Sequence, residues 1–389
     1  MKMVNSYTIK IEKIIKNKLC CGCGVCENIC PKSAISMMEN DEGFLYPQIN
    51  HDLCVSCKKC EKHCPILCVE KVKLGEHEIH AYAVSLSDED KLKKTASGGV
   101  STALAEYMIQ NNGIVYGVSY DDYYFSARHI RVAEASSIEK IMQTKYIQSV
   151  KANIYHLVQK DLWDDKKVLY TGTPCEVAAL KTYLDKDYEN LYTCELICHG
   201  PTNGKAQEMY INYLEEKESA KVKKFLVRSK CNGWKTPTFE VELDNGKTIV
   251  EEFYRSEMGI IFSNFTRESC YNCQYKGNNK AADITVGDFW GITEESKFWK
   301  KYGVSAVMTH SLKGEKLLQS ISGIDIHECK YQEILDNNPM LVRSRFRPHN
   351  RSRFGKHISV YGIEYAIGHI DSGMCKLKKL VKRIVRGVE

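Results

Sequence analysis

The chain has 389 residues, 43% hydrophobic and 27% charged, a composition typical of a globular protein of two or three domains. Its net charge of +6 is too modest to indicate a nucleic-acid partner, and no apolar run approaches the roughly 20 residues of a membrane span. The lysine-rich start lacks the apolar core of an export signal, so we expect a cytoplasmic protein. Because disulfides are rare in the cytosol, its 18 cysteines indicate metal ligands.

The first cysteine-rich part repeats one spacing. Residues 20 to 31 read CCGCGVCENICP and residues 54 to 65 read CVSCKKCEKHCP, and both contain the bacterial ferredoxin run C-x2-C-x2-C-x3-C-P. In such a run three cysteines bind one [4Fe–4S] cluster and the fourth serves the other cluster. The predicted ligands are Cys20, Cys23, Cys26 and Cys64 for the first cluster, and Cys54, Cys57, Cys60 and Cys30 for the second.

We therefore predict an α+β, ferredoxin-like domain with two clusters over residues 1–70. Zinc is the alternative, since C-x2-C pairs also bind zinc. A zinc site, however, does not require the cysteine before proline that ends both runs. Cys21, next to a predicted ligand, is interpreted as a spare thiol.

A second composition begins near Ala81, after a linker. HAYAVSLS is predicted to be a strand, and KKTASGGV leads into a helix of apolar period 3.6 that ends at Asn112 before the strand IVYGVSY. Backbone amides of Ser97, Gly98 and Gly99 at the helix start could bind an anion, although such a cap is more often structural. No GxGxxG run follows a strand, so the common dinucleotide motif is absent.

The segment TGTPCEVAALK, residues 171 to 181, places a cysteine at a predicted helix start. KKVLY before it indicates a buried strand, Thr173 suits the cap and Pro174 suits the first helical turn. The helix dipole is expected to lower the pKa of the Cys175 thiol and favour a thiolate, either a nucleophile or a metal ligand. A nucleophile needs a base, and His199 is a candidate only by proximity.

A second strand–turn–helix pattern, LYTCELICHGPTNGK, ends its strand at Cys198. Right-handed crossover would make the two strands parallel neighbours, with Cys175 and Cys198 at the sheet edge where ligands bind. With Cys270 and Cys273 these make four cysteines, the number for a third [4Fe–4S] cluster or one zinc ion. Cys194 is the alternative to Cys198.

The segments ASGGV, KYIQS, GTPCEVAALK, CHGP and C-x2-C…ADITVGDFWG occur in this order and resemble the family of coenzyme F420 hydrogenase and dehydrogenase beta subunits over about residues 80 to 330. The resemblance implies a larger α/β flavin-binding domain with FAD and a [4Fe–4S] cluster beside the flavin ring. It implies cluster ligation by Cys175, Cys198, Cys270 and Cys273, and an FAD site lined by Ser97, Gly98, Gly99, Lys145, Gln148 and Ser149. Glu176 departs from the family, which often has glutamine there.

We accordingly divide the large domain into residues 79–155, expected to bind the FAD phosphate and flavin, and residues 156–330, expected to complete the cluster and flavin site. The expected function is an iron–sulfur flavoprotein oxidoreductase that passes electrons between a small organic substrate, coenzyme F420 or another, and the clusters. The alternatives are an electron-transfer subunit with no organic substrate of its own, docked on a partner protein, and a zinc-held scaffold. Lys145 is a candidate cation for reduced flavin or a solvated lysine, and Asp283 and Asp288 are expected to cap turns.

Residues 331–389 are predicted to form a C-terminal extension. Five arginines, interpreted as a solvated basic loop rather than a face for an acidic cofactor or partner, are Arg343, Arg345, Arg347, Arg351 and Arg353. The tail CKLKKLVKRIVRGVE predicts a basic amphipathic helix that could contact a membrane surface, a partner or its own domain. Cys231, Cys329 and Cys375 are interpreted as ordinary thiols.

Overall fold

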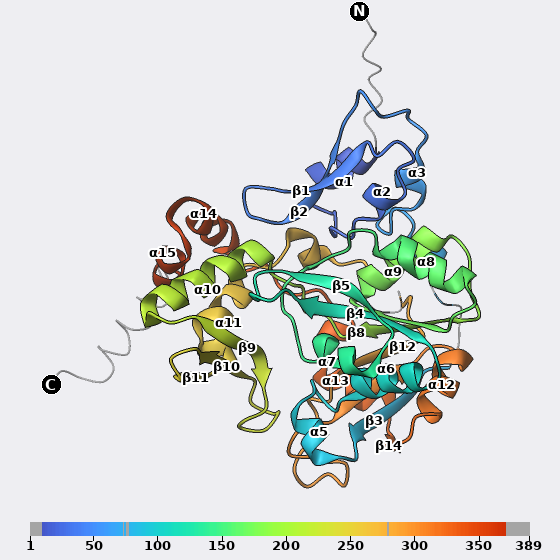
Figure 1. The fold of residues 1–389 in the computed structure, drawn as a ribbon, viewed down its shortest axis with the longest axis vertical. Coiled ribbons are helices and arrows are strands. Elements are labelled where there is room, and N and C mark those ends of the chain that lie inside the picture. Colours follow the sequence, from blue (N-terminus) through green and yellow to red (C-terminus); the bar gives the residue numbers. More distant parts are fainter. Residues whose placement is uncertain (1–9, 73, 75–77, 278–279, 371–389) are drawn as a thin grey trace, which may run out of the picture.

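The structure is a computed structural model that describes residues 10–72, 74, 78–277 and 280–370. It combines a small N-terminal unit with a larger mixed α/β domain, as Figure 1 shows. The predicted basic helix and Cys375 lie outside the described residues. No helix among those described is long and apolar enough to cross a membrane.

The N-terminal unit is built from one antiparallel strand pair and short helices. Strands β1 (Ile35–Glu39) and β2 (Leu45–Ile49) pair with Ile35 opposite Ile49. The helices are α1 (Lys10–Lys16), α2 (Val25–Asn28), α3 (Lys59–Lys62) and α4 (Val69–Val72). Helices α2 and α3 each follow a left-handed residue, Gly24 and Lys58, so the two cysteine runs share one local geometry. This agrees with the predicted repeat.

The large domain is centred on a nine-stranded mixed sheet. In spatial order its strands are β14 (Ile324–Glu328), β3 (His80–Leu86), β13 (Ser305–Thr309), β12 (Ile284–Asp288), β8 (Leu191–Leu196), β7 (Val168–Gly172), β4 (Ile114–Tyr120), β5 (Ala127–Val132) and β6 (Ser149–Val150). Strands β12, β8, β7 and β4 are parallel neighbours at the centre. Strand β3 lies between β14 and β13, so residues from both predicted parts of the large domain share one sheet.

Helices cover both faces of this sheet. On one face α8 (Ile154–Trp163) and α9 (Pro174–Leu184) pack on Val168 and Tyr170 of β7, together with Val25 of the N-terminal unit. On the other face α6 (Val100–Gln110) and α12 (Leu312–Gln319) pack on Leu169. Because parallel strands are buried on both sides, β7 begins with the buried run Val168 to Tyr170, as KKVLY predicted. The N-terminal unit therefore lies over the α8–α9 face (Figure 1).

A second sheet forms beside the first. Strands β9 (Val222–Ser229), β10 (Thr238–Leu243) and β11 (Thr248–Glu252) pair antiparallel. The helices packed with them are α10 (Gly204–Glu218), α11 (Glu257–Asn264), α14 (Arg351–Tyr361) and α15 (Ile363–Gly368). Phe44 of the N-terminal unit joins this core. The remaining elements are α5 (Glu89–Lys93), α7 (Ile138–Ile141), α13 (Tyr331–Asn337), η1 (Ala135–Ser137), η2 (Phe253–Arg255), η3 (Glu268–Asn272) and η4 (Pro339–Leu341).

Three of the five C-terminal arginines contradict the prediction of a solvated basic loop. Arg351 is fully buried and donates two hydrogen bonds, of 2.7 and 2.8 Å, to the carboxylate of Glu42 in the N-terminal unit. Arg347 makes a bidentate pair with Glu268, and Arg345 donates to backbone carbonyls of α11. These planar cations join segments that are distant in sequence, which the loop's composition alone does not reveal.

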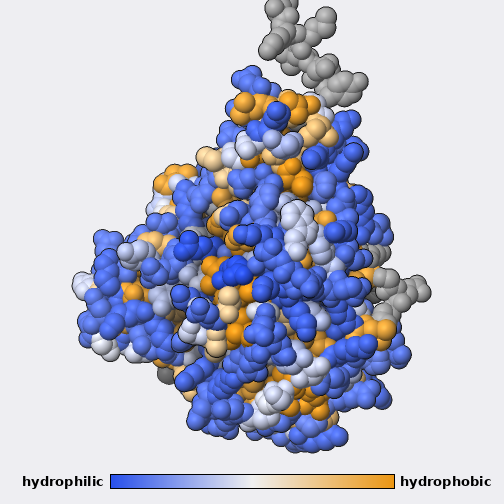
Figure 2. Space-filling model, turned by 45° about the vertical axis from the view of Figure 1, so that its right-hand side comes forward, coloured by the Kyte–Doolittle hydropathy of each residue, from blue (hydrophilic) through white to orange (hydrophobic). Residues whose placement is uncertain are grey.

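Hydrophilic residues cover most of the molecular face in Figure 2, and apolar residues appear there in small separate groups. Among the exposed apolar side chains are Leu53 and Val55, which flank Cys54 in the second cysteine run. The second run thus lies nearer to solvent than the first, whose Cys23 and Cys26 are buried.

Candidate functional site

The thiols predicted for the first cluster surround a common cavity. Cys20, Cys23, Cys26 and Cys64 all line one small pocket that is partly open to solvent. Electrostatic interactions link Cys26 with Cys20 and Cys64, and Cys23 with Cys64. Burial raises the pKa of the Cys64 thiol to about 12, so a bound metal would be needed to keep it as a thiolate. The arrangement suits a cubane whose fourth ligand comes from the second cysteine run.

The thiols predicted for the second cluster lie at the outer end of the unit. Cys60 interacts with Cys54 and Cys57, and burial raises its pKa to about 11. Cys57 is exposed. The Cys30 sulfur accepts a hydrogen bond of 3.3 Å from the Ala34 amide.

The four thiols predicted for a third cluster converge from three segments of the large domain. Cys175 begins α9, Cys198 follows β8, and Cys270 and Cys273 lie in and after η3. The Cys270 thiol interacts with each of the other three. Cys175, Cys270 and Cys273 line one small, mainly apolar pocket.

Gly200 permits the approach of Cys198 to Cys270. Its φ is +89°, and a Cβ there would lie 2.9 Å from the Cys270 Cβ. Its amide donates a hydrogen bond of 3.3 Å to the Cys198 sulfur. The glycine of CHGP is therefore required by both backbone conformation and space.

Cys194, the alternative ligand, lies elsewhere. It is fully buried in the core between the sheet and α6, where burial raises the pKa of its thiol. The groups that act on it electrostatically are Glu195 and Asp283, not the other thiols. The structure thus groups Cys198, and not Cys194, with the other three cysteines.

The local structure around Cys175 confirms part of the sequence prediction. Strands β7 and β8 are parallel neighbours, Pro174 opens α9, and Thr173 with Glu176 forms a capping box. The expected lowering of the thiol pKa is wrong. The pKa of Cys175 is raised well above its usual value by the neighbouring Cys21 thiol and by burial, which together outweigh the helix dipole. No interaction joins Cys175 to His199 within the part of the chain that the structure describes.

Among the described residues, no three or more His, Cys, Asp or Glu side chains are grouped so that they could hold one metal ion. A [4Fe–4S] cluster does not require side chains grouped around one ion, because each of its four thiolates binds a separate iron.

The residues predicted to line an FAD site occupy three places. Gly98 and Gly99 pack tightly on the sheet, since a Cβ would meet the Val84 carbonyl oxygen at 2.2 Å and the Leu86 side chain at 2.4 Å. Ser97 bonds to Gly287 and Ser305, which again indicates a packing role for this turn.

Lys145 is half-buried, and removal of its ammonium group from water lowers its pKa to about 7. Its ammonium group donates to backbone carbonyls, among them that of Met142, and lies 5.9 Å from the Tyr120 ring centroid. No carboxylate contributes to this shift. An anionic ligand would therefore supply a favourable counter-charge, and the interpretation as a solvated lysine is wrong.

Further cations that the sequence did not single out lie on β9 and just after it. Arg228 pairs with Asp288 at 2.7 Å, so Asp288 forms an ion pair rather than capping a turn. Lys230, also buried with its pKa lowered to about 7, donates to the carbonyl of Ser97. The Tyr146 side chain interacts with Arg228, which connects the Lys145 segment to this group. Only the folded chain brings these cations together.

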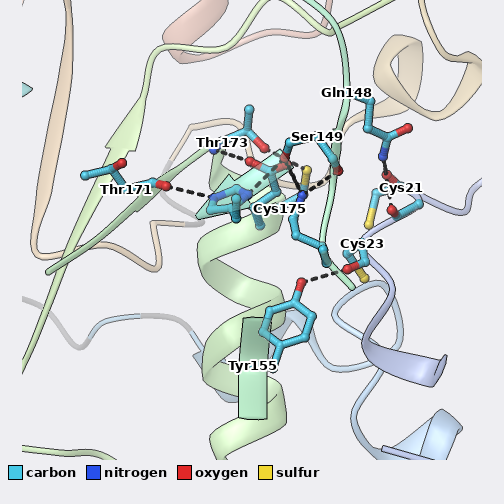
Figure 3. A network of polar contacts seen from close by, with 12 residues as sticks. Cys21, Cys23, Gln148, Ser149, Tyr155, Thr171, Thr173 and Cys175 are labelled. Atoms are coloured by element: carbon cyan, nitrogen blue, oxygen red, sulfur yellow. Dashed lines mark hydrogen bonds and ion pairs between the residues drawn. The ribbon is translucent and has the colours of Figure 1, made fainter. Parts of the chain in front are cut away.

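Gln148 contacts the loop that carries Cys21, and Ser149 contacts the first turn of α9. The Gln148 side chain donates to the carbonyl oxygens of Cys21 at 2.7 Å and Gly22 at 3.1 Å. Ser149 donates to Glu176, which forms a buried ion pair with Lys151 (Figure 3). Asp283 accepts from Thr193 and Ser311 and so joins β8 to the start of α12.

The fold and its grouped cysteines define an iron–sulfur protein of the electron-transfer class. Residues 165–332 match the family model for the C terminus of the coenzyme F420 hydrogenase/dehydrogenase beta subunit, and residues 19–68 match the 4Fe-4S dicluster domain. Residues 165–332 therefore carry the C-terminal domain of this beta-subunit family, with the dicluster domain in front. The resemblance seen in the sequence is thereby confirmed.

Among solved structures, a chain of the F420-reducing [NiFe] hydrogenase complex from Methanosarcina barkeri is similar, with 18% identity and a TM-score of 0.47. The similarity covers 69% of this chain and 90% of that chain. No curated protein sequence matches.

Proposed function

We propose that this chain is an iron–sulfur flavoprotein oxidoreductase that exchanges electrons between a small organic hydride donor or acceptor, such as coenzyme F420, and three [4Fe–4S] clusters. The observation that carries the proposal is the convergence of Cys175, Cys198, Cys270 and Cys273 beside the first ferredoxin cluster site. FAD would supply the conversion between hydride and single electrons, and the clusters carry single electrons.

The chain's own residues have defined tasks in this function. The three sets of thiols would hold the clusters in a row from the interior of the large domain to exposed Cys57. Half-buried Lys145 and buried Lys230 would provide positive charge for FAD or for its reduced, anionic ring. The glycines of ASGGV would let this turn pack closely on the sheet, and they would not contact FAD directly. These tasks require no dedicated acid–base pair.

The first test is the content of iron, sulfide, zinc and flavin after anaerobic purification and reconstitution. We expect about twelve irons and one FAD per chain, since three cubanes contain four irons each. About twelve irons without flavin would favour a pure electron-transfer subunit. About eight irons with no flavin would contradict the proposal.

Lys145→Met should weaken FAD binding by about tenfold to a hundredfold, the equivalent of losing a hydrogen bond to a charged group. In the wild type the charge on Lys145 is lost as pH rises past its pKa of about 7, so FAD affinity should fall from pH 6 to pH 8. The variant should lack this dependence. Flavin fluorescence titration measures both effects, with exposed Lys140→Met as the control. Equal FAD affinity in the two variants would rule out the role of Lys145.

A further inference from the structure

Cys21 lies in the wall between two cluster sites. It lines the cavity formed by the first ferredoxin cysteines and also the cavity formed by Cys175, Cys270 and Cys273. Ile66 is the other residue common to both linings. The Cys21 thiol interacts with Cys23 on one side and with Cys175 on the other. Cys21, interpreted from the sequence as a spare thiol, therefore lies between two groups of predicted ligands.

The loop that carries Cys21 is held firmly by the large domain. Gln148 binds the carbonyls of Cys21 and Gly22, and buried Arg267 donates to the Cys20 carbonyl at 2.8 Å. The Tyr155 hydroxyl donates to the Cys23 carbonyl at 2.7 Å, and Figure 3 shows this loop facing the start of the helix with Cys175.

Gly22 allows this close fit. Its φ is +69°, and a Cβ would lie 2.6 Å from the Gln148 amide nitrogen and 2.8 Å from the Arg267 guanidinium. The polar side chains of part-buried Gln148 and buried Arg267 thus fix the backbone on both sides of Cys21.

We propose that Cys21 is a positioning residue shared by the first and third clusters, whose single S–H proton donates to the ligating sulfur of Cys23 in one rotamer and to that of Cys175 in another. The inference rests on the proposed function, because it requires the third cluster. A hydrogen bond to a cluster sulfur stabilises the more negative, reduced state, and so raises the reduction potential. One side chain would then raise the reduction potentials of two neighbouring clusters together. The difference between the two potentials would stay small, and electron transfer between the clusters would stay close to balance.

Cys68 offers a matched control. It is a second non-ligand thiol near the first cluster, since it acts electrostatically on Cys64. Its sulfur donates to the carbonyl of Lys62 at 3.2 Å, and it lines neither cavity. Removing it should leave the third cluster unaffected.

The test is a redox titration of the reconstituted full-length chain, followed by electron paramagnetic resonance. Cys21→Ala should keep about twelve irons and shift the potentials of the first and third clusters downward. Cys21→Ser, which retains a donor, should restore both, and Cys68→Ala should leave the third cluster unchanged.

Three results would overturn the inference. Unchanged potentials in Cys21→Ala would exclude the shared donor. Loss of about four irons in that variant would make Cys21 a ligand instead. A wild-type count of about eight irons would remove the third cluster, and with it both this inference and that part of the proposed function.

Discussion

Cys198→Ala should lower the iron content from about twelve to about eight per chain, while the two ferredoxin clusters remain. Cys198 is grouped with Cys175, Cys270 and Cys273, and a cubane that loses one of four thiolates is poorly held. The eight ferredoxin cysteines lie in a separate unit whose cavity does not include Cys198. Reduction of the ferredoxin clusters by a substrate-reduced flavin should therefore be lost as well. Iron and sulfide analysis with electron paramagnetic resonance measures the effect.

Cys194→Ala is the matched control for this experiment. Cys194 lies four residues earlier, on strand β8, but in the core under α6. Its removal should cost about 1 kcal/mol of stability through a small cavity and leave the iron content unchanged. An unchanged iron content in Cys198→Ala, or a loss of four irons in Cys194→Ala, would contradict the assignment of the third site.

Local patterns account for what the sequence predicted well. The spacing of the cysteine runs, the Thr173 cap and the apolar strand before it depend on neighbours along the chain, and each occurs in the structure. The parallel pairing of β7 and β8 followed from the handedness of a single crossover.

The contacts that sequence reasoning missed join distant segments. Arg351 and Glu42 are 309 residues apart, and Arg267 reaches the carbonyl of Cys20 across 247 residues. Gln148 belongs to a segment that resembles the family's flavin site, yet it binds the Cys21 loop. Spacing within one segment carries no information about such partners, so their roles depended on the folded arrangement.

Glu176 shows how a residue set aside at the level of sequence becomes important in the fold. Its carboxylate is buried and forms an ion pair with Lys151, while its second oxygen accepts the Thr173 amide at 2.8 Å. The Lys151 side chain is only 2% exposed. Burial would raise the pKa of Glu176, but Lys151 and His129 hold it at about 2. The pair therefore fixes the start of the helix that carries Cys175.

Glu176→Gln should destabilise the chain by about 3–5 kcal/mol, because it leaves the Lys151 ammonium buried without its counter-charge. The expected result is a thermal midpoint lower by about 6 °C or more. Since the folded pKa of Glu176 is lowered from 4.5 to about 2, its contribution is complete above pH 4.5 and is lost as pH falls toward 2. The difference in midpoint between wild type and variant should shrink over that range.

The double variant Glu176→Gln, Lys151→Met separates the charge effect from the loss of the cap. It removes both charges, so it should recover much of the stability lost in Glu176→Gln, as happens when buried ion pairs are replaced by neutral side chains. Thermal unfolding of the three proteins under one set of anaerobic conditions gives the comparison. If the double variant is no more stable than Glu176→Gln, the helix cap and not the ion pair is the main contribution of Glu176.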